Sequence, residues 1–324
     1  MTSPLLHRPG AVAADPPDDA VAAHYGDPLR EQRRLEAGHG LVDLSHRGVV
    51  RISGPDRLSW LHSLTSQHLT SLAPGTATEA LVLSPHGHVE HALYLLDDGE
   101  ATWAHVEPGT APALVAFLDR MRFLLRVEVT ELTSELAVVW ALRPRPDLPA
   151  RVVRAGRLGV EHLLPRDALD AATAGEELAG LWAYEGLRVA AHLPRLGVDT
   201  DARTIPHEVG WLGAAVHLDK GCYRGQETVA RVHNLGRPPR RLLFLHLDGS
   251  ADALPAPGAA VELAGRPVGF VGTAVRHHEL GPIALALVKR SVPLDAELTA
   301  AGVPAAQEVV VPDEEPKVRP RLSR

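Results

Sequence analysis

The sequence predicts an α+β protein that ends in a small antiparallel β-barrel, and three observations predict this class. At 324 residues, the chain exceeds the size at which one hydrophobic core usually suffices, so more than one domain is expected. Before residue 236, stretches with helical apolar spacing are mixed with shorter stretches typical of strands. After it, short strand-like stretches follow one another closely, separated by Gly-rich turns, as in small barrels.

The composition narrows the range of functions. Hydrophobic residues make up 45% of the chain, which is ample for a buried core, and the net charge is -7. An acidic balance argues against broad nucleic-acid binding, so a nucleic-acid partner is not expected. A single cysteine excludes an intrachain disulfide and suits a reducing compartment. With no membrane-length apolar run and no signal-peptide core at the N-terminus, we expect a cytoplasmic protein without a membrane partner.

The N-terminal part of the chain predicts an arm and then a compact region. Residues 1–24 are rich in Pro, Ala and Asp, which predicts a flexible arm. Asp27 and Pro28 then form a typical helix start. The patterns that follow define an α+β region over residues 25–236. Its expected helices and strands are helix 29–37, strand 49–52, helix 56–64, strands 81–83 and 92–96, helix 110–121, strands 125–132 and 136–142, short strands within 151–164, and helices 167–173 and 176–191.

Two Pro-rich stretches punctuate this order. Residues 143–150 contain a Pro-stiffened loop, which marks the expected boundary between two lobes of the α+β region. A basic Pro/Gly segment at 233–241 separates these lobes from the C-terminal module, and we expect the β-barrel over residues 237–312. Residues 313–324 are charged and Pro-rich, which predicts a disordered tail.

The only cysteine lies in the sequence Asp219-Lys-Gly-Cys-Tyr-Arg-Gly-Gln-Glu227. Its glycines predict a turn, and the residues from Glu227 onward predict a short helix. A cysteine before a helix and between the cations Lys220 and Arg224 is expected to favour its thiolate form, because positive charge stabilises that form. The alternative is that Cys222 is a small buried hydrophobic residue, and local chemistry leaves both interpretations open.

A histidine-rich stretch from His86 to His91 raises the question of a metal site. In an extended strand, His91 points away from residues 86, 88 and 90, and no second group of fitting spacing accompanies them. We therefore predict no metal site.

The cysteine stretch, Lys220-Gly-Cys-Tyr-x-Gly-Gln-Glu227, resembles the signature of the YgfZ family of folate-binding proteins, which is associated with the maturation of iron–sulfur enzymes. This family is a branch of the superfamily that includes the aminomethyltransferase (T-protein) of the glycine cleavage system. A second match, Asp43-x-Ser-His46 before a strand and then Ser-Gly-Pro-Asp56, extends the resemblance over most of the chain. The resemblance implies T-protein-like lobes, with ferredoxin-like sheets and helices around a central hole, followed by the barrel.

The resemblance also implies a ligand, tetrahydrofolate or a one-carbon derivative, and residues that contact it. Arg188 matches a Leu-Arg segment that holds the pterin, and Glu208 lies in a matching Pro-x-Glu segment. A carboxylate can accept from the adjacent amino and ring N–H groups of a pterin, although Glu208 also fits a solvated loop and Arg188 a surface pair with Glu185. Arg47 directly follows the segment that borders the folate cavity. Trp182 or Tyr184 is expected to stack on a ring.

The function that follows is a tetrahydrofolate-binding protein that supports assembly or repair of iron–sulfur clusters in client proteins. Its functional motif would be Cys222, Lys220 and Arg224 at the rim of the folate cavity, with the thiol acting as nucleophile, redox group or transient cluster ligand. One alternative is an aminomethyltransferase-type one-carbon transferase. Against it, His91 and Ala92 stand where T-proteins carry paired aspartates. A tRNA-modification factor is the other alternative, and the acidic net charge gives it little support.

Overall fold

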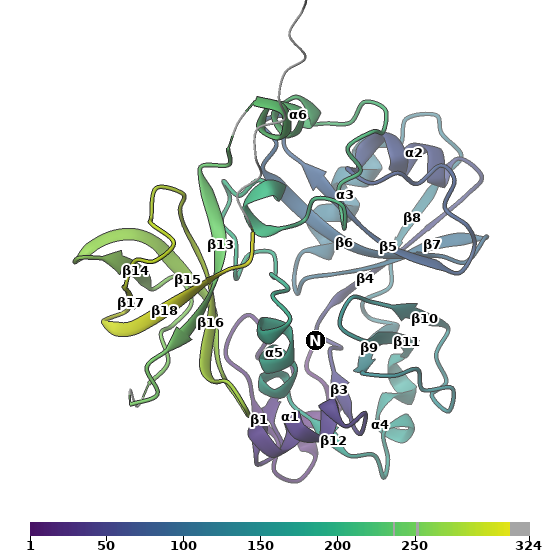
Figure 1. Ribbon diagram of the computed structural model, residues 1–324. Coiled ribbons are helices and arrows are strands. Elements are labelled where there is room, and N and C mark those ends of the chain that lie inside the picture. The colour runs from purple at the N-terminus through teal and green to yellow at the C-terminus, as the bar shows by residue number, and fades with distance from the viewer. Residues whose placement is uncertain (236, 251–252, 312–324) are drawn as a thin grey trace, which may run out of the picture.

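The computed structural model of the protein describes residues 1–235, 237–250 and 253–311. Three lobes surround helix α5 (Leu181–Ala190), which lies near the centre of the molecule (Figure 1). Two of the lobes are built on five-stranded sheets, and the third is a closed antiparallel barrel. The expected disordered tail, 313–324, lies outside the described residues.

The first lobe is a five-stranded antiparallel sheet with strand order β5-β6-β7-β4-β8. Helices α2 and α3 pack on it, and the apolar side chains between them form one core around Trp60 and Phe117. Its elements are β4 (Gly48–Ser53), α2 (Arg57–Leu64), β5 (Thr76–Leu83), β6 (Val89–Asp97), β7 (Ala101–Val106), α3 (Ala111–Met121) and β8 (Glu128–Glu131).

The second lobe has the strand order β10-β11-β9-β3-β12, with one parallel pair between β12 and β3. Its central strand, β9, is buried over its whole length and carries Trp140, which packs edge-on against Tyr184 at 5.3 Å between ring centroids. Its elements are α1 (Pro28–Glu36), β3 (Leu41–Asp43), β9 (Leu136–Ala141), β10 (Val152–Ala155), β11 (Val160–Pro165), the 3₁₀ turn η2 (Arg166–Ala168), α4 (Leu169–Ala172) and β12 (Leu178–Ala179).

The third lobe is a six-stranded barrel with the order β13-β16-β15-β14-β17-β18, closed by pairing of β18 with β13. Strands with inward-facing Leu, Val and Ala side chains fill its interior, so the barrel is a packed core. Its strands are β13 (Arg240–Leu247), β14 (Ala260–Leu263), β15 (Arg266–His277), β16 (Gly281–Lys289), β17 (Leu298–Ala300) and β18 (Val303–Val309).

Two further segments connect the lobes. The 3₁₀ turn η3 (Pro206–Val209) and helix α6 (Gln226–Leu235) bracket the loop that carries Cys222. Trp211 and Tyr223 from this loop share one apolar core with the β5–β6 hairpin and the outer face of β13 and β16. The loop is therefore packed between the first lobe and the barrel.

The N-terminal residues differ from the flexible arm that their composition predicts. They form a 3₁₀ turn, η1 (Pro4–His7), and a two-stranded ribbon, β1 (Val12–Ala13) with β2 (Ala22–His24). Leu5 and Val21 are fully buried, and Asp18 pairs with Arg195 at 2.9 Å. A few apolar and charged anchors hold this segment, and its prolines have little backbone freedom to lose on ordering.

The fold class predicted from sequence, an α+β protein with a C-terminal antiparallel barrel, is confirmed. The helix start at Asp27 is confirmed as well, since its carboxylate accepts from the amides of Leu29 and Arg30 at 3.1 and 3.0 Å. The predicted helix 176–191 is shorter, because residues 178–179 pair with β3 as a strand. Among the helices in the described ranges, none is long and apolar enough to cross a bilayer.

Candidate functional site

A polar cavity lies where β5, β6, β11 and α5 meet the segment from Leu193 to Arg195. Its volume is about 40 Å³, far below that of a usual small-molecule site. Charged and aromatic side chains fill most of the space between the lobes. The lining residues are Arg47, Glu79, Tyr94, Arg154, Arg157, Leu158, Glu161, Tyr184, Arg188, Leu193, Pro194, Arg195 and Trp211.

Arg47 is the central cation of this cavity. Its guanidinium lies over the rings of Tyr94 and Tyr184, at 5.6 and 5.8 Å from their centroids. It is 4.0 Å from Glu107, and its Nε is buried without a hydrogen-bond partner among the described residues. The unsatisfied Nε could donate to a flat polar ring, whereas the tyrosine rings are already covered by Arg47, and that of Tyr94 also stacks on His105 at 4.8 Å between ring centroids.

Glu79 is a carboxylate that the sequence analysis did not single out. It lies on β5, is 9% exposed and lines the cavity. The nearest cation is Arg154, 3.9 Å away, which is beyond hydrogen-bonding distance. Burial raises the pKa of Glu79 above its ordinary value, because the charge of Arg154 offsets the lost hydration only in part. Its position directly before the apolar run 80–83 was the sequence signal that could have identified it.

Arg188 also lines the cavity, as expected, but its donors are already bound. The guanidinium pairs with Asp199 at 2.8 Å and with Glu185, and it donates to the carbonyl of Leu193 and to the hydroxyl of Thr273. These partners come from the helix itself, the following loop and the barrel. Arg188 therefore fastens α5 to β15, and a ligand could reach it only by displacing one of these partners.

Arg195 closes the cavity on its far side. It pairs with Asp18 and Glu107 at 2.9 Å each and with Glu185 at 3.4 Å, all of them buried. Beyond it lies a second hollow of about 450 Å³, lined by the N-terminal segment, α5 and the barrel. Trp182 lies in this second hollow and is 44% exposed, so the structure separates it from Tyr184 and the central cavity.

The structure separates Glu208 from Arg188, the two residues that were expected to hold the pterin together. Its carboxylate accepts two hydrogen bonds from Arg240, at 2.8 Å each, and one from the amide of Ile205 at 3.1 Å. Glu208 borders a different hollow, beside α6, and does not share a pocket with Arg188. The Pro-x-Glu spacing has a local cause, because the carboxylate caps the backbone at the start of η3 and binds the first residue of the barrel.

Cys222 is exposed, which favours an accessible thiol over a buried hydrophobic residue. The residues before it dock on the end of α2. Ser66 donates to the carbonyl of Ala215 at 2.6 Å, and the amide of His217 donates to the carbonyl of Ser66 at 2.9 Å. The lining residues of the central cavity that the structure describes do not include Cys222. The loop reaches that cavity only at Trp211.

The two cations beside Cys222 do not act as the sequence predicts. The ammonium of Lys220 is buried and donates to the carbonyls of His62 and Thr65, and burial lowers the pKa of Lys220 to about 8. Arg224 pairs with Glu90 at 2.8 Å. Helix α6 begins at Gln226, so the thiol lies before its first turn. Both cations anchor the loop, and the expected activation of the thiol has no support in these contacts.

One cluster has the composition of a metal site. Glu36, His277 and His278 bring three ligand atoms within 4.8 Å of one another, where α1 meets the end of β15. However, Nδ1 of His277 accepts from the amides of Glu279 and Leu280 at 3.2 Å, which places the proton of the neutral ring on Nε2, facing Glu36. His278 lies 2.6 Å from the same carboxylate. This arrangement serves as a polar clamp between α1 and the barrel.

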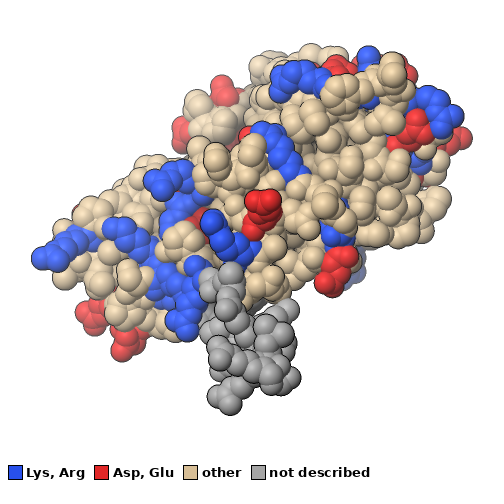
Figure 2. Space-filling view, turned by 90° about the horizontal axis from the view of Figure 1, so that it is seen from above, with Lys and Arg blue, Asp and Glu red and all other residues tan. Residues whose placement is uncertain are grey.

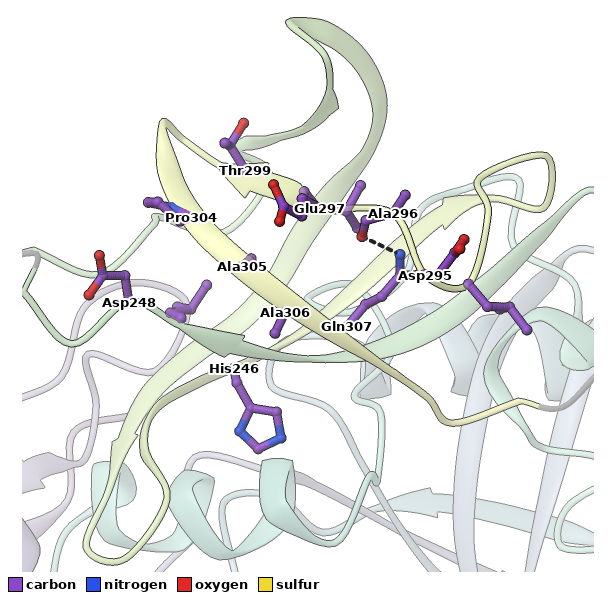
Figure 3. A pocket seen from close by; sticks show the side chains of 13 residues that line it. His246, Asp248, Asp295, Ala296, Glu297, Thr299, Pro304, Ala305, Ala306 and Gln307 are labelled. Atoms are coloured by element: carbon purple, nitrogen blue, oxygen red, sulfur yellow. Dashed lines mark hydrogen bonds between the residues drawn. The ribbon is translucent and has the colours of Figure 1, made fainter.

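A hollow of about 760 Å³ lies on the barrel, between the end of β13 and strands β17 and β18 (Figure 3). Its carboxylates, Asp248, Asp295 and Glu297, come from the loops around it. Gln307 donates to the carbonyls of Pro293 and Ala296 at 2.9 and 2.8 Å and so holds that loop against β18. These acidic side chains would repel the carboxylates or phosphates of a ligand. The central cavity is therefore the better candidate site.

Comparisons with known proteins agree with this architecture. The family described as "CAF17, C-terminal beta-barrel domain" matches residues 240–317. An "Iron-sulfur cluster assembly factor IBA57 homolog, mitochondrial" from Mycosarcoma maydis is 28% identical over 63% of this chain. The match spans only 56% of that relative's own length. An aminomethyltransferase from Moorella thermoacetica is 29% identical over 83% of each chain.

The similarity extends to a solved structure. The glycine cleavage system aminomethyltransferase T from Bartonella henselae superposes with a TM-score of 0.78 over 94% of both chains, at 19% sequence identity. At that identity the match shows a shared fold alone. Together, the barrel, the relatives and the fold support the similarity to the YgfZ/IBA57-type branch of the aminomethyltransferase superfamily that the motif around Cys222 predicted.

Proposed function

We propose that this chain binds a tetrahydrofolate in the central cavity and supports assembly or repair of iron–sulfur clusters in client proteins through Cys222. The observation that carries the proposal is the combination of an exposed thiol with a buried site of uncommitted polar groups. The IBA57 homologue, an iron–sulfur cluster assembly factor by name, supports the role.

The polar groups of the cavity match those of a pterin. Glu79 can accept from the adjacent amino and ring N–H groups, and the free Nε of Arg47 can donate to the ring carbonyl. Tyr94 and Tyr184 line the cavity beside Arg47, and a pterin could stack on either ring only if that guanidinium moved aside. When bound, the folate would supply one-carbon or redox chemistry, while the residues of this chain hold and orient it.

The size of the cavity sets a condition on binding. About 40 Å³ cannot hold a pterin, so the lining must open when the ligand enters. The β10–β11 turn is the part best placed to move, because Arg157 and Leu158 line the cavity and Arg157 is exposed. The strands behind that turn are paired over their whole length, so the motion would be confined to the turn.

Cys222 could serve as one ligand of a cluster that is passed on. A single thiolate cannot hold an iron–sulfur cluster alone, so the remaining ligands must come from a partner protein. The exposed position of Cys222, on a loop fixed at both ends, suits such shared ligation. The cluster is cargo in this scheme.

The rival function is that of a one-carbon transferase, which the aminomethyltransferase relatives favour. His91 and Ala92 on β6 carry no carboxylate, so the acid–base partner expected of such an enzyme is missing at these positions. Transfer of an aminomethyl group to tetrahydrofolate by the purified chain would favour the rival.

The test is complementation of a strain that lacks the chain, with the activity of an iron–sulfur enzyme as the readout. Wild type is expected to restore activity and Cys222→Ser to fail, with both proteins present at equal levels. Asp219→Ala, an exposed neighbour in the same loop, is the control and is expected to restore activity. Full restoration by Cys222→Ser would exclude the role proposed for the thiol.

A further inference from the structure

A hollow of about 660 Å³ lies beside α6, where the β5–β6 turn, the segment from Asp201 to Glu208 and the start of the barrel meet. It is separate from the central cavity and has no part in the function proposed above. Its volume falls within the range of sites for nucleotide-sized molecules. Figure 2 shows this side of the molecule from above, with Lys and Arg side chains crowding the middle and left of the face.

The charges around the hollow do not balance. Arg240 binds both carboxylates of the hollow, Asp201 at 2.6 Å and Glu208 at 2.8 Å. Arg203, Arg231 and Lys289 also line the hollow and are exposed, and within the described residues none of them forms an ion pair. Four cations against two carboxylates give the hollow a positive charge, on a chain whose net charge is -7.

The walls of the hollow are fixed in place. The turn between β5 and β6 lies directly on α6, since a Cβ on Gly87 would come within 2.8 Å of the Cβ of Thr228. The amide of Val89 donates to the carbonyl of Thr204 at 2.9 Å, which ties the same turn to the opposite wall. A rigid, concave, positive site loses little entropy on binding an anion.

We propose that this hollow binds a small phosphorylated molecule of nucleotide size. Arg203, Arg231 and Lys289 would contact the phosphate, because guanidinium groups match phosphate oxygens in pairs and the excess charge matches a phosphate dianion. Val232, Ile205 and Pro239 provide apolar surface for the rest of the molecule. A concave site on an acidic chain suits a single small anion better than a nucleic-acid strand, which requires a long basic track.

Calorimetric titration of the full chain tests this proposal, with inorganic pyrophosphate, adenosine 5′-monophosphate and adenosine as probes. We expect the two phosphorylated probes to bind and adenosine not to bind. The double variant Arg231→Gln/Lys289→Gln should bind pyrophosphate at least tenfold more weakly. The control variant Arg33→Gln/Arg120→Gln removes two other exposed arginines and should bind as wild type does. Circular dichroism checks that both variants are folded.

Three results would overturn the proposal. The first is no binding of either phosphorylated probe by the wild type, and the second is equal weakening in the control variant, which would indicate nonspecific attraction. The third is tighter, steeply salt-dependent binding of a single-stranded oligonucleotide that displaces pyrophosphate, which would make the surface a nucleic-acid site instead. Folate binding enters none of these readouts, so the outcome is independent of the central cavity.

Discussion

At the scale of single residues, the central cavity depends on buried charged side chains, and sequence patterns do not show which of them face it. Motif spacing pointed to Glu208, whose carboxylate is bound by Arg240, whereas Glu79 faces the cavity without a close partner. A carboxylate's role depends on which cations the fold brings near it, and that is decided by residues distant in the chain. The fold brings three of the expected contact residues, Arg47, Tyr184 and Arg188, around one cavity, and their contact with a folate stays a prediction.

Arg195 gives a test of these buried charges. Replacing it with Met should lower the free energy of unfolding by about 3–5 kcal/mol, because Asp18, Glu107 and Glu185 would remain buried without their shared cation. Arg126→Met, which breaks an exposed pair with Asp56, should change it little. Urea denaturation measures both variants. Equal effects would show that the Arg195 network is not buried in solution.

His207 predicts a pH dependence. Burial lowers the pKa of His207 to about 4, from an ordinary value near 6.5. Between pH 6.5 and about 4, the unfolded chain therefore binds a proton that the folded chain does not. The contribution of the neutral ring to stability is fully present above 6.5 and is lost as the pH falls toward 4. It is worth up to about 3 kcal/mol.

The variant His207→Leu should therefore lose less stability than wild type between pH 6.5 and 4, as measured by urea denaturation at several pH values. The substitution is matched to the site, because both ring nitrogens are buried without hydrogen-bond partners among the described residues. Parallel curves for the two proteins would contradict the assigned burial of His207.

At the scale of elements, the turn before α6 packs closely against the β5–β6 hairpin. Gly225 has a φ of +82°, and a Cβ there would come within 2.6 Å of the carbonyl oxygen of Ser84. Gly213 has a similar φ of +78° but open space around it. An alanine at either position would have to adopt the same left-handed backbone conformation, but only at Gly225 would its Cβ also clash with a neighbour.

Gly225→Ala should therefore destabilise the protein more than Gly213→Ala, for which left-handed strain alone costs roughly 1–2 kcal/mol. It should also change the rate at which Cys222 reacts with iodoacetamide, because the displaced turn adjoins the thiol loop. Thermal unfolding and alkylation kinetics measure the two effects. Equal melting temperatures for the variants would argue against close packing of the turn on Ser84.

The N-terminal segment shows why composition alone misled. Its Pro, Ala and Asp content is typical of disorder, yet Leu5 and Val21 are buried and Asp18 joins the Arg195 network. Deletion of residues 2–24 should destabilise the protein and expose the Arg195 network, whereas a flexible arm would be dispensable. Limited proteolysis offers a second check, since the native segment should resist cleavage.

At the scale of the whole molecule, apolar periodicity and turn signals predicted the α+β class and the C-terminal barrel, because these signals are local. The expected lobe boundary at 143–150 instead lies between β9 and β10, which belong to one sheet. It did not predict that Trp182 and Tyr184, two residues apart, would border different hollows. That separation arises because α5 lies between the lobes, so successive faces of one helix meet different partners. Lys220 and Arg224 likewise contact the first lobe, which sequence proximity to Cys222 could not show.

The most direct test of the central claim is a calorimetric titration with tetrahydrofolate, comparing wild type, Glu79→Gln and Glu208→Ala. The account predicts saturable binding by wild type and a loss of at least tenfold in Glu79→Gln, because the neutral amide cannot accept both pterin hydrogen bonds as a carboxylate does. Glu208→Ala, if folded, should still bind. Absence of binding by wild type, or loss in Glu208→Ala with Glu79→Gln unaffected, would contradict the placement of a folate in the central cavity.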